Sequence, residues 1–230
     1  MTANLEFQKV SESARWRGFS NLFHKENRSW WGTRRWWINI LLWPAMICGV
    51  LGLALFVFPT VLQAVDDPGI AALGGPVPFA LEIGRTIFFE LGTMAFAIGA
   101  IILCQDLIVE EKNSGVTEWL LSKPVTRRAY LLSKLAANLI SLLVLTIAVP
   151  SMLGYLLFSL RLGEFYPLQP FLSGIGVQAL HTIFYLTLTL MLGTLFNNRA
   201  PILGVTFASL MGGSMIGGFI KRLLYVTPWS

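Results

Sequence analysis

Long unbroken apolar runs constrain this chain more than any other feature of its sequence. The first, Ile38–Leu62, contains no charged residue, and four more cover about residues 86–108, 132–160, 171–196 and 202–220. A helix of about 20 such residues crosses the ~30 Å hydrocarbon layer of a membrane. The runs are continuous, whereas barrel strands alternate, and helices satisfy all their backbone hydrogen bonds in lipid. The sequence therefore predicts an all-α polytopic transmembrane bundle of about five spans.

The composition excludes other classes of protein. Hydrophobic residues make up 55% of the 230 residues, and charged residues only 13%, about half of the ~25% usual in soluble domains. A soluble enzyme cannot bury that much apolar surface, and a disordered chain needs the opposite composition. The polar first 37 residues are shorter than the ~40 that a domain usually needs to fold alone. We expect one membrane domain over residues 1–230, with five spans in 38–220 and an outer tail at 221–230.

The distribution of Lys and Arg predicts the orientation. Thirteen of the 17 basic residues lie in 1–37, in 107–134 or at Arg199, and the other four are Arg85, Arg161, Lys221 and Arg222. Basic residues collect in cytoplasmic loops of membrane proteins. We therefore place the N-terminus in the cytoplasm and loops 63–85 and 161–170 outside, in a multi-pass protein of the plasma or inner membrane. The net charge of +5 is then explained by the lipid surface, and no nucleic-acid partner is expected.

Residues 15–31 predict an amphipathic helix that lies on the membrane surface. One helical face carries Trp16, Phe19, Phe23 and Trp30, and the opposite face carries Arg17, Asn21, Lys25 and Arg28. A basic face opposite an aromatic face suits the cytoplasmic lipid surface. A plain membrane anchor explains the same pattern.

The segment 107–135 predicts a second, shorter amphipathic helix between two spans. Val116, Trp119 and Leu120 share one face, Gly115 precedes them, and Pro124 ends the helix. Thr126 is placed to cap the next helix. The carboxylates of Glu110, Glu111 and Glu118 are expected to form an acidic rim that accepts arginine. The segment is either an ordinary interfacial loop or a docking element for a cytoplasmic partner.

This segment resembles the cytoplasmic loop of ABC-2-type transporter permeases, the membrane subunits of ATP-driven ABC exporters. The matching residues are Glu110, Glu111, Ser114, Gly115, Leu120, Leu121, Ser122, Pro124, Val125, Thr126, Arg127 and Lys134. Val116 departs from the family pattern, in which Thr is commoner, although Thr117 follows it. Lys25-Glu26-x-Arg28 is similar to the interface helix of the family. The resemblance covers the layout of about residues 15–225, and only 107–135 is specific residue by residue.

The resemblance implies that a separate ATPase subunit docks on this loop and binds ATP and Mg²⁺, while two permease protomers, identical or different, form the transporter. It assigns the docking to Glu110, Glu111, Gly115, Glu118, Trp119, Leu120, Pro124 and Arg127, and the interface helix to Trp16, Phe19, Phe23, Lys25, Glu26 and Arg28. The chain itself has no Gly-Lys pair, so it lacks a phosphate-binding loop, and no cofactor is expected in it. The family usually has six spans, so the sixth is expected to be missing and the C-terminus to lie outside.

Three polar residues inside the spans are candidates for a transport route: Glu90, Gln178 and His181. Ionisable groups within spans are functional candidates by default. The alternatives are that Glu90 pairs with Arg85 near the outer surface, and that Gln178 and His181 bond neighbouring helices. Asp106 and Glu110 share a face but lack the further ligands of a metal site. The small-residue pairs Ala45/Gly49, Ala95/Gly99 and Gly213/Gly217 permit close helix packing, either within one protomer or at a dimer seam.

Two other functions fit the sequence less well. An intramembrane protease of the Glu-Glu-x-x-x-Arg type would need Arg where Gly115 stands, and a Ser–His protease would need a Gly-x-Ser-Gly motif, which does not occur. A secondary transporter would be supported by inverted repeats, and none is found; a membrane scaffold protein is the remaining alternative.

Overall fold

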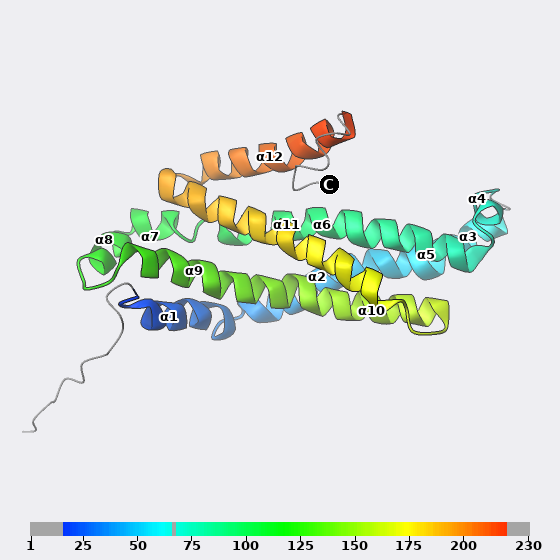
Figure 1. Cartoon of the computed structure of the whole chain (residues 1–230), viewed down its shortest axis with the longest axis horizontal. Coiled ribbons are helices and arrows are strands. Elements are labelled where there is room, and N and C mark those ends of the chain that lie inside the picture. Colours follow the sequence, from blue (N-terminus) through cyan, green and yellow to red (C-terminus); the bar gives the residue numbers. More distant parts are fainter. Residues whose placement is uncertain (1–15, 66–67, 220–230) are drawn as a thin grey trace, which may run out of the picture.

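The protein is a bundle of helices that run along one long axis (Figure 1). The computed structural model describes residues 16–65 and 68–219, and for residues 214–219 it describes the backbone alone. This described part contains helices and no strand, which confirms the all-α class.

Three long helical stretches each contain a π-helical turn, labelled η. The first runs through α2 (Arg35–Gly52), η1 (Leu53–Val57) and α3 (Phe58–Ala64), the second through α5 (Pro76–Thr86), η2 (Ile87–Leu91) and α6 (Gly92–Cys104), and the third through α9 (Arg127–Leu142), η3 (Leu143–Ala148) and α10 (Val149–Leu162). The other helices are α1 (Phe19–Trp31), α4 (Pro68–Ala72), α7 (Val109–Asn113), α8 (Val116–Leu121), α11 (Leu168–Leu195) and α12 (Arg199–Phe219).

Four stretches of the described residues are long and apolar enough to cross a membrane: Arg35–Ala64, Pro76–Asn113, Arg127–Leu162 and Leu168–Leu195. The protein is therefore a multi-pass membrane protein. The fifth expected run forms α12, and whether it crosses the membrane stays a prediction. The expected outer tail, 221–230, lies outside the described residues.

The second span begins ten residues earlier than the sequence predicts. Its helix starts at Pro76 rather than near Thr86, so most of the expected loop 63–85 is helical. Glu82 and Arg85 interrupt the apolar run and hide the true start. One helical turn brings them together, with Arg85 Nη2 2.6 Å from Glu82 Oε2. Arg85 therefore pairs with Glu82. The alternative in which Arg85 pairs with Glu90 is wrong.

The third span accommodates Pro150 through a widened turn. Proline in a helix removes one N–H donor and crowds the carbonyl four residues earlier, which here belongs to Thr146. That carbonyl lies in the π-helical turn η3, which ends two residues before Pro150. A π turn is one of the usual ways in which a helix adapts to such a distortion.

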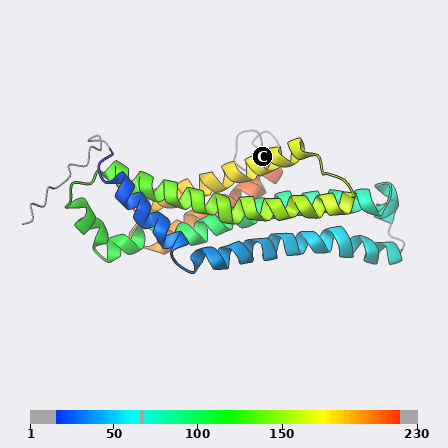
Figure 2. The same cartoon turned by 90° about the horizontal axis from the view of Figure 1, so that it is seen from below.

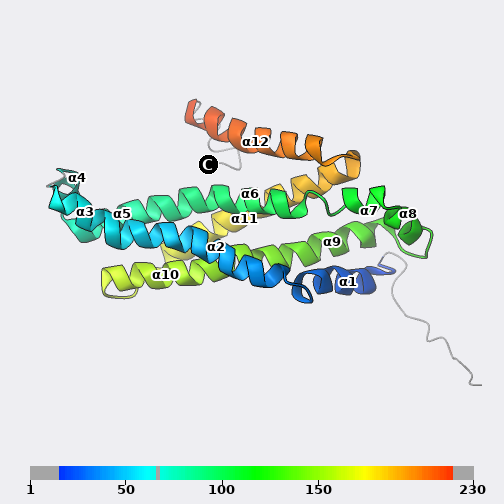
Figure 3. The same ribbon diagram turned by 180° about the vertical axis from the view of Figure 1, so that it is seen from behind.

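Aromatic side chains fill the core between the spans. Trp43, Phe88, Phe96, Phe158 and Phe171 belong to one buried cluster contributed by five helical segments. A Cβ atom at Gly99 would collide with the Trp43 ring, so this small residue serves packing within one protomer. Figure 3 shows α2 running beside α6 and α10, with α4 at one end and α1, α7 and α8 at the other. We call these the α4 end and the α8 end.

Candidate functional site

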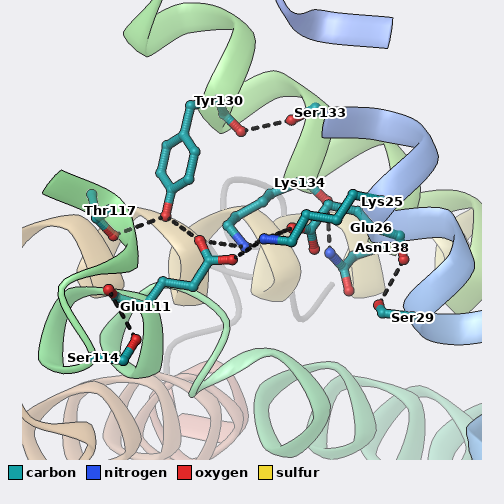
Figure 4. Close-up of polar contacts among 10 residues, drawn as sticks. All are labelled: Lys25, Glu26, Ser29, Glu111, Ser114, Thr117, Tyr130, Ser133, Lys134 and Asn138. Atoms are coloured by element: carbon teal, nitrogen blue, oxygen red, sulfur yellow. Dashed lines mark hydrogen bonds and ion pairs between the residues drawn. The ribbon is translucent and has the colours of Figure 1, made fainter. Parts of the chain in front are cut away.

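A cluster of four charged side chains, of which Glu26 and Lys134 are buried, joins three separate elements at the α8 end (Figure 4). Lys134 of α9 is 2% exposed. Its Nζ lies 2.9 Å from Glu26 Oε1 of α1 and 3.0 Å from Glu111 Oε2 of α7. Lys25 Nζ, from α1, lies 2.7 Å from the other oxygen of Glu111. Two ammonium groups and two carboxylates balance, which satisfies charges that would be costly to bury alone.

Tyr130 extends this cluster to α8. Its hydroxyl donates a hydrogen bond of 2.8 Å to Glu111 Oε2 and lies 3.4 Å from Thr117 Oγ1. Tyr130 and Lys134 occupy successive turns of α9, so both reach the same carboxylate. The start of α8 is thereby connected through polar contacts to α7 and α9.

The sequence did not predict that α1 packs against α9. Leu22, Glu26 and Trp30 are the buried residues of α1, and Figure 2 shows α1 crossing α9. Trp16 precedes the helix and is 48% exposed. Phe19 and Phe23, at the edge, stack on each other at 5.9 Å.

Hydrogen bonds and an ion pair between α1 and α9 determine which face of α1 is buried. Trp30 Nε1 donates to Asn138 Oδ1 at 2.8 Å, and Asn138 Nδ2 donates to the Lys134 carbonyl at 2.7 Å. α9 offers Lys134 and Asn138 to α1, so Glu26 faces inward although its charge predicts exposure.

Lys112 binds the end of another span. Its ammonium donates to the carbonyls of Gly193, Thr194 and Phe196 at 2.9, 2.7 and 3.2 Å. These carbonyls terminate α11 and lack partners within the helix, and a cation there also complements the helix dipole. Sequence reasoning missed this role because the two partners are about 80 residues apart.

The short helix α8 forms as predicted. Gly115 precedes it with φ +72°, a left-handed conformation that glycine adopts without steric cost. The helix ends at Leu121, before Pro124, and the Thr126 hydroxyl accepts a hydrogen bond from Ala129 N to cap α9. The local signals in 107–135 were sufficient because each acts within a few residues.

Most of the predicted docking residues face outward. α8 has no buried residue, and Trp119 is 59% exposed, with Lys123 Nζ 3.8 Å above its ring. Glu110, Glu118 and Arg127 are exposed, and none has an ion pair within the described residues. Leu120 is half-buried. Glu111 departs from the predicted acidic rim, because it points inward to the buried lysine.

A cleft of about 770 Å³ lies between α1 and the adjoining ends of α6 and α7. Arg28 and Arg35 line one wall, and Asp106 and Glu110 line the other. Within the described residues, no group of three His, Cys, Asp or Glu side chains is close enough to hold a metal ion.

The three polar residues predicted inside the spans lie in different surroundings. Gln178 is buried, and its Nε2 donates to the Phe88 carbonyl of η2 at 3.0 Å, so it bonds a neighbouring helix. His181 is 4% exposed and contacts the Tyr185 ring. Glu90 is exposed. The structure therefore separates Glu90 from the other two.

Short polar contacts at the α8 end connect α7 to three other helices. Glu111 connects α7 to α1 and α9, and the adjacent Lys112 connects it to α11. A displacement of the exposed α8 would reach two spans and α1 through these contacts. Such rigid-body coupling through packed elements is a common way to move domains.

Comparison with known protein families gives a match over most of the chain. The family model described as "ABC-2 family transporter protein" matches residues 20–228. Comparisons with curated proteins and with solved structures give no significant match. The family is a membrane component of transporters and is not itself catalytic. Because the match covers nearly the whole chain, this protein belongs to the ABC-2 family of transporter proteins.

Proposed function

We propose that this chain is the permease subunit of an ATP-driven exporter and that a separate ATPase subunit docks on α7 and α8. The supporting observation is that, within residues 110–123, α8 is exposed whereas α7 is held by polar contacts. Trp119 and Glu118 are exposed on a helix with no buried residue, whereas the base of that helix is held by Glu111 and Lys112. An exposed aromatic beside charges is typical of an interface anchor.

The orientation follows from the positive charges. Among the described residues, eleven of the 13 Lys and Arg side chains belong to segments at the α8 end, and the other two are Arg85 and Arg161. This end therefore faces the cytoplasm, with α1 at the inner surface of the plasma membrane. The ATPase reaches α8 from the same side and supplies the bound ATP and Mg²⁺. A second permease protomer, identical or related, completes the transport route.

The test removes the exposed anchor and leaves the base intact. Trp119→Ala and Glu118→Arg are compared with Phe165→Ala, which alters an 88% exposed aromatic at the α4 end. Truncating an interface anchor costs about 2 kcal/mol, so ATPase affinity should fall ~30-fold. ATP-driven transport in proteoliposomes should fall with it, while the melting temperature of the permease stays unchanged.

Phe165→Ala should retain wild-type ATPase binding and transport. If no ATPase co-purifies with the wild-type permease, or if Trp119→Ala and Glu118→Arg bind it as tightly as wild type, the docking proposal is wrong.

A further inference from the structure

Glu90 lies inside the second span, nearer to its Pro76 end than to its Asn113 end. It is 14 residues after Pro76 and 14 before Cys104 in one continuous helical stretch. At about 1.5 Å per residue the stretch measures roughly 40 Å, which exceeds the ~30 Å hydrocarbon layer by about 10 Å. Even if all of this excess projected on one side, Glu90 would remain about 10 Å inside the hydrocarbon.

The carboxylate has no partner in the described part of the chain. Glu90 is exposed, and it makes no hydrogen bond or ion pair with the described residues. Phe88 and Gly92, on the other side of the helix, are buried, with Gly92 against Gln178. Arg85 is the nearest cation along the helix, and Glu82 engages it at 2.6 Å.

An outward-facing carboxylate at this depth is not compatible with lipid. An ionised acidic side chain is costly inside a span, and such residues almost always face protein or a water-filled cavity. Glu90 also lies in the π-helical turn η2, a distortion that is frequent at functional sites. The face that carries Glu90 is therefore covered by protein or by water in the assembled transporter.

A second copy of this chain does not supply the missing cation from its described residues. Two protomers related by an axis along the membrane normal place equal residues at equal depths. The other described Lys and Arg side chains lie near the ends of the spans, from Arg35 and Lys134 at the α8 end to Arg161 at the α4 end. A symmetric dimer in which Glu90 pairs with a described Lys or Arg of the second copy is therefore excluded.

Building on the proposed permease function, we propose that the helix face bearing Glu90 lines the water-filled transport route and that its carboxylate binds a cationic group of the cargo. The charge of the carboxylate selects the class of cargo, an organic cation with an ammonium or phosphonium centre. Glu90, rather than Gln178 or His181, contacts the cargo, because Gln178 and His181 are packed between helices.

The first experiment measures access of water to position 90. Glu90→Cys and Met152→Cys are each made in a chain carrying Cys48→Ala and Cys104→Ala, the changes that remove both native cysteines. Met152 is 70% exposed on α10 and represents a lipid-facing site. A charged, membrane-impermeant thiosulfonate should modify position 90 about tenfold faster or more, because thiolates form in water and not in lipid. Equal rates at both positions would overturn the proposal.

The second experiment tests the role of the charge. Binding of tetraphenylphosphonium and of its near-isosteric anion tetraphenylborate is measured on the ATPase-bound transporter. Glu90→Gln, which keeps the shape, should weaken binding of the cation about tenfold or more without weakening binding of the anion. Glu90→Asp should retain most of the preference for the cation. An equal change for both ions, or no change, would contradict the proposal.

The two proposals fail in different ways. Labelling at position 90 requires only the permease in its membrane, whereas the Trp119→Ala test requires the ATPase. If the ATPase binds and position 90 is unreactive, this inference alone is wrong. If position 90 reacts and no ATPase binds, the docking proposal alone is wrong.

Discussion

Glu111 and Lys112 are neighbours in the chain, and their side chains anchor α7 in different directions. Glu111 lies 3.0 Å from Lys134 of α9, whereas Lys112 donates to the carbonyl of Thr194, 2.7 Å away at the end of α11. One short helix thus bridges the third and fourth spans. The two residues give the exposed α8 a rigid base.

Removing the central ammonium should destabilise the protein. Lys134→Met leaves the buried Glu26 with only the half-exposed Lys25, 3.9 Å away, as a counter-charge. Breaking a buried pair in this way costs about 3–5 kcal/mol. We expect a clear decrease in the melting temperature of the purified protein in detergent. Lys123→Met, at an exposed position on the loop after α8, is the matched control and should change it little. The double variant Lys134→Met/Glu26→Met should recover part of the loss, because one unpaired charge is removed; no recovery would contradict the pairing.

The hydrogen bond between Trp30 and Asn138 should hold α1 against α9. Trp30→Phe removes the indole N–H and leaves the buried Asn138 oxygen without its donor, which costs about 1–3 kcal/mol. Hydrogen exchange at the amides of α1 should accelerate. Trp31→Phe, at a residue 38% exposed, provides the control with the same change in side chain. Equal exchange in the two variants would show that the bond does not hold α1.

Lys112 should protect the last turn of α11. Lys112→Met removes three hydrogen bonds to carbonyls at that helix end and a favourable dipole interaction of about 0.3–1 kcal/mol. We expect faster hydrogen exchange at residues 192–196 and weaker coupling between ATP hydrolysis and transport. Lys123→Met again serves as the control for hydrogen exchange. Unchanged exchange in Lys112→Met would mean that the cap is dispensable.

Gly115 should be needed for its conformation rather than for space. No atom lies within 4 Å of a Cβ built there, and φ is +72°, so Gly115→Ala introduces about 1–2 kcal/mol of backbone strain alone. Gly176→Ala, in the open middle of α11, should instead be neutral or stabilising. ATPase binding should decrease for Gly115→Ala, and Gly115→Asn should be milder because asparagine tolerates this region. Equal ATPase binding by Gly115→Ala and wild type would show that the turn is not needed for docking.

The sequence by itself determined the class of fold, four of the spans and the course of segment 107–135. These features depend on local properties: unbroken apolar runs require helices in lipid, and Gly115, Pro124 and Thr126 act on the backbone within a few residues. The same locality explains the misplaced start of the second span, because Glu82 and Arg85 are polar as separate residues and nearly neutral as a pair.

The tertiary structure alone decided which polar residues act together. Lys134 meets Glu26 and Glu111 only because α1 and α7 fold onto α9, and Lys112 reaches α11 only across a distance of about 80 residues in the chain. Burial likewise separated Gln178 and His181, which pack between helices, from Glu90, which faces outward. Such contacts depend on where helices lie in space, and the residue types of one segment do not specify the side chains that another segment brings beside them.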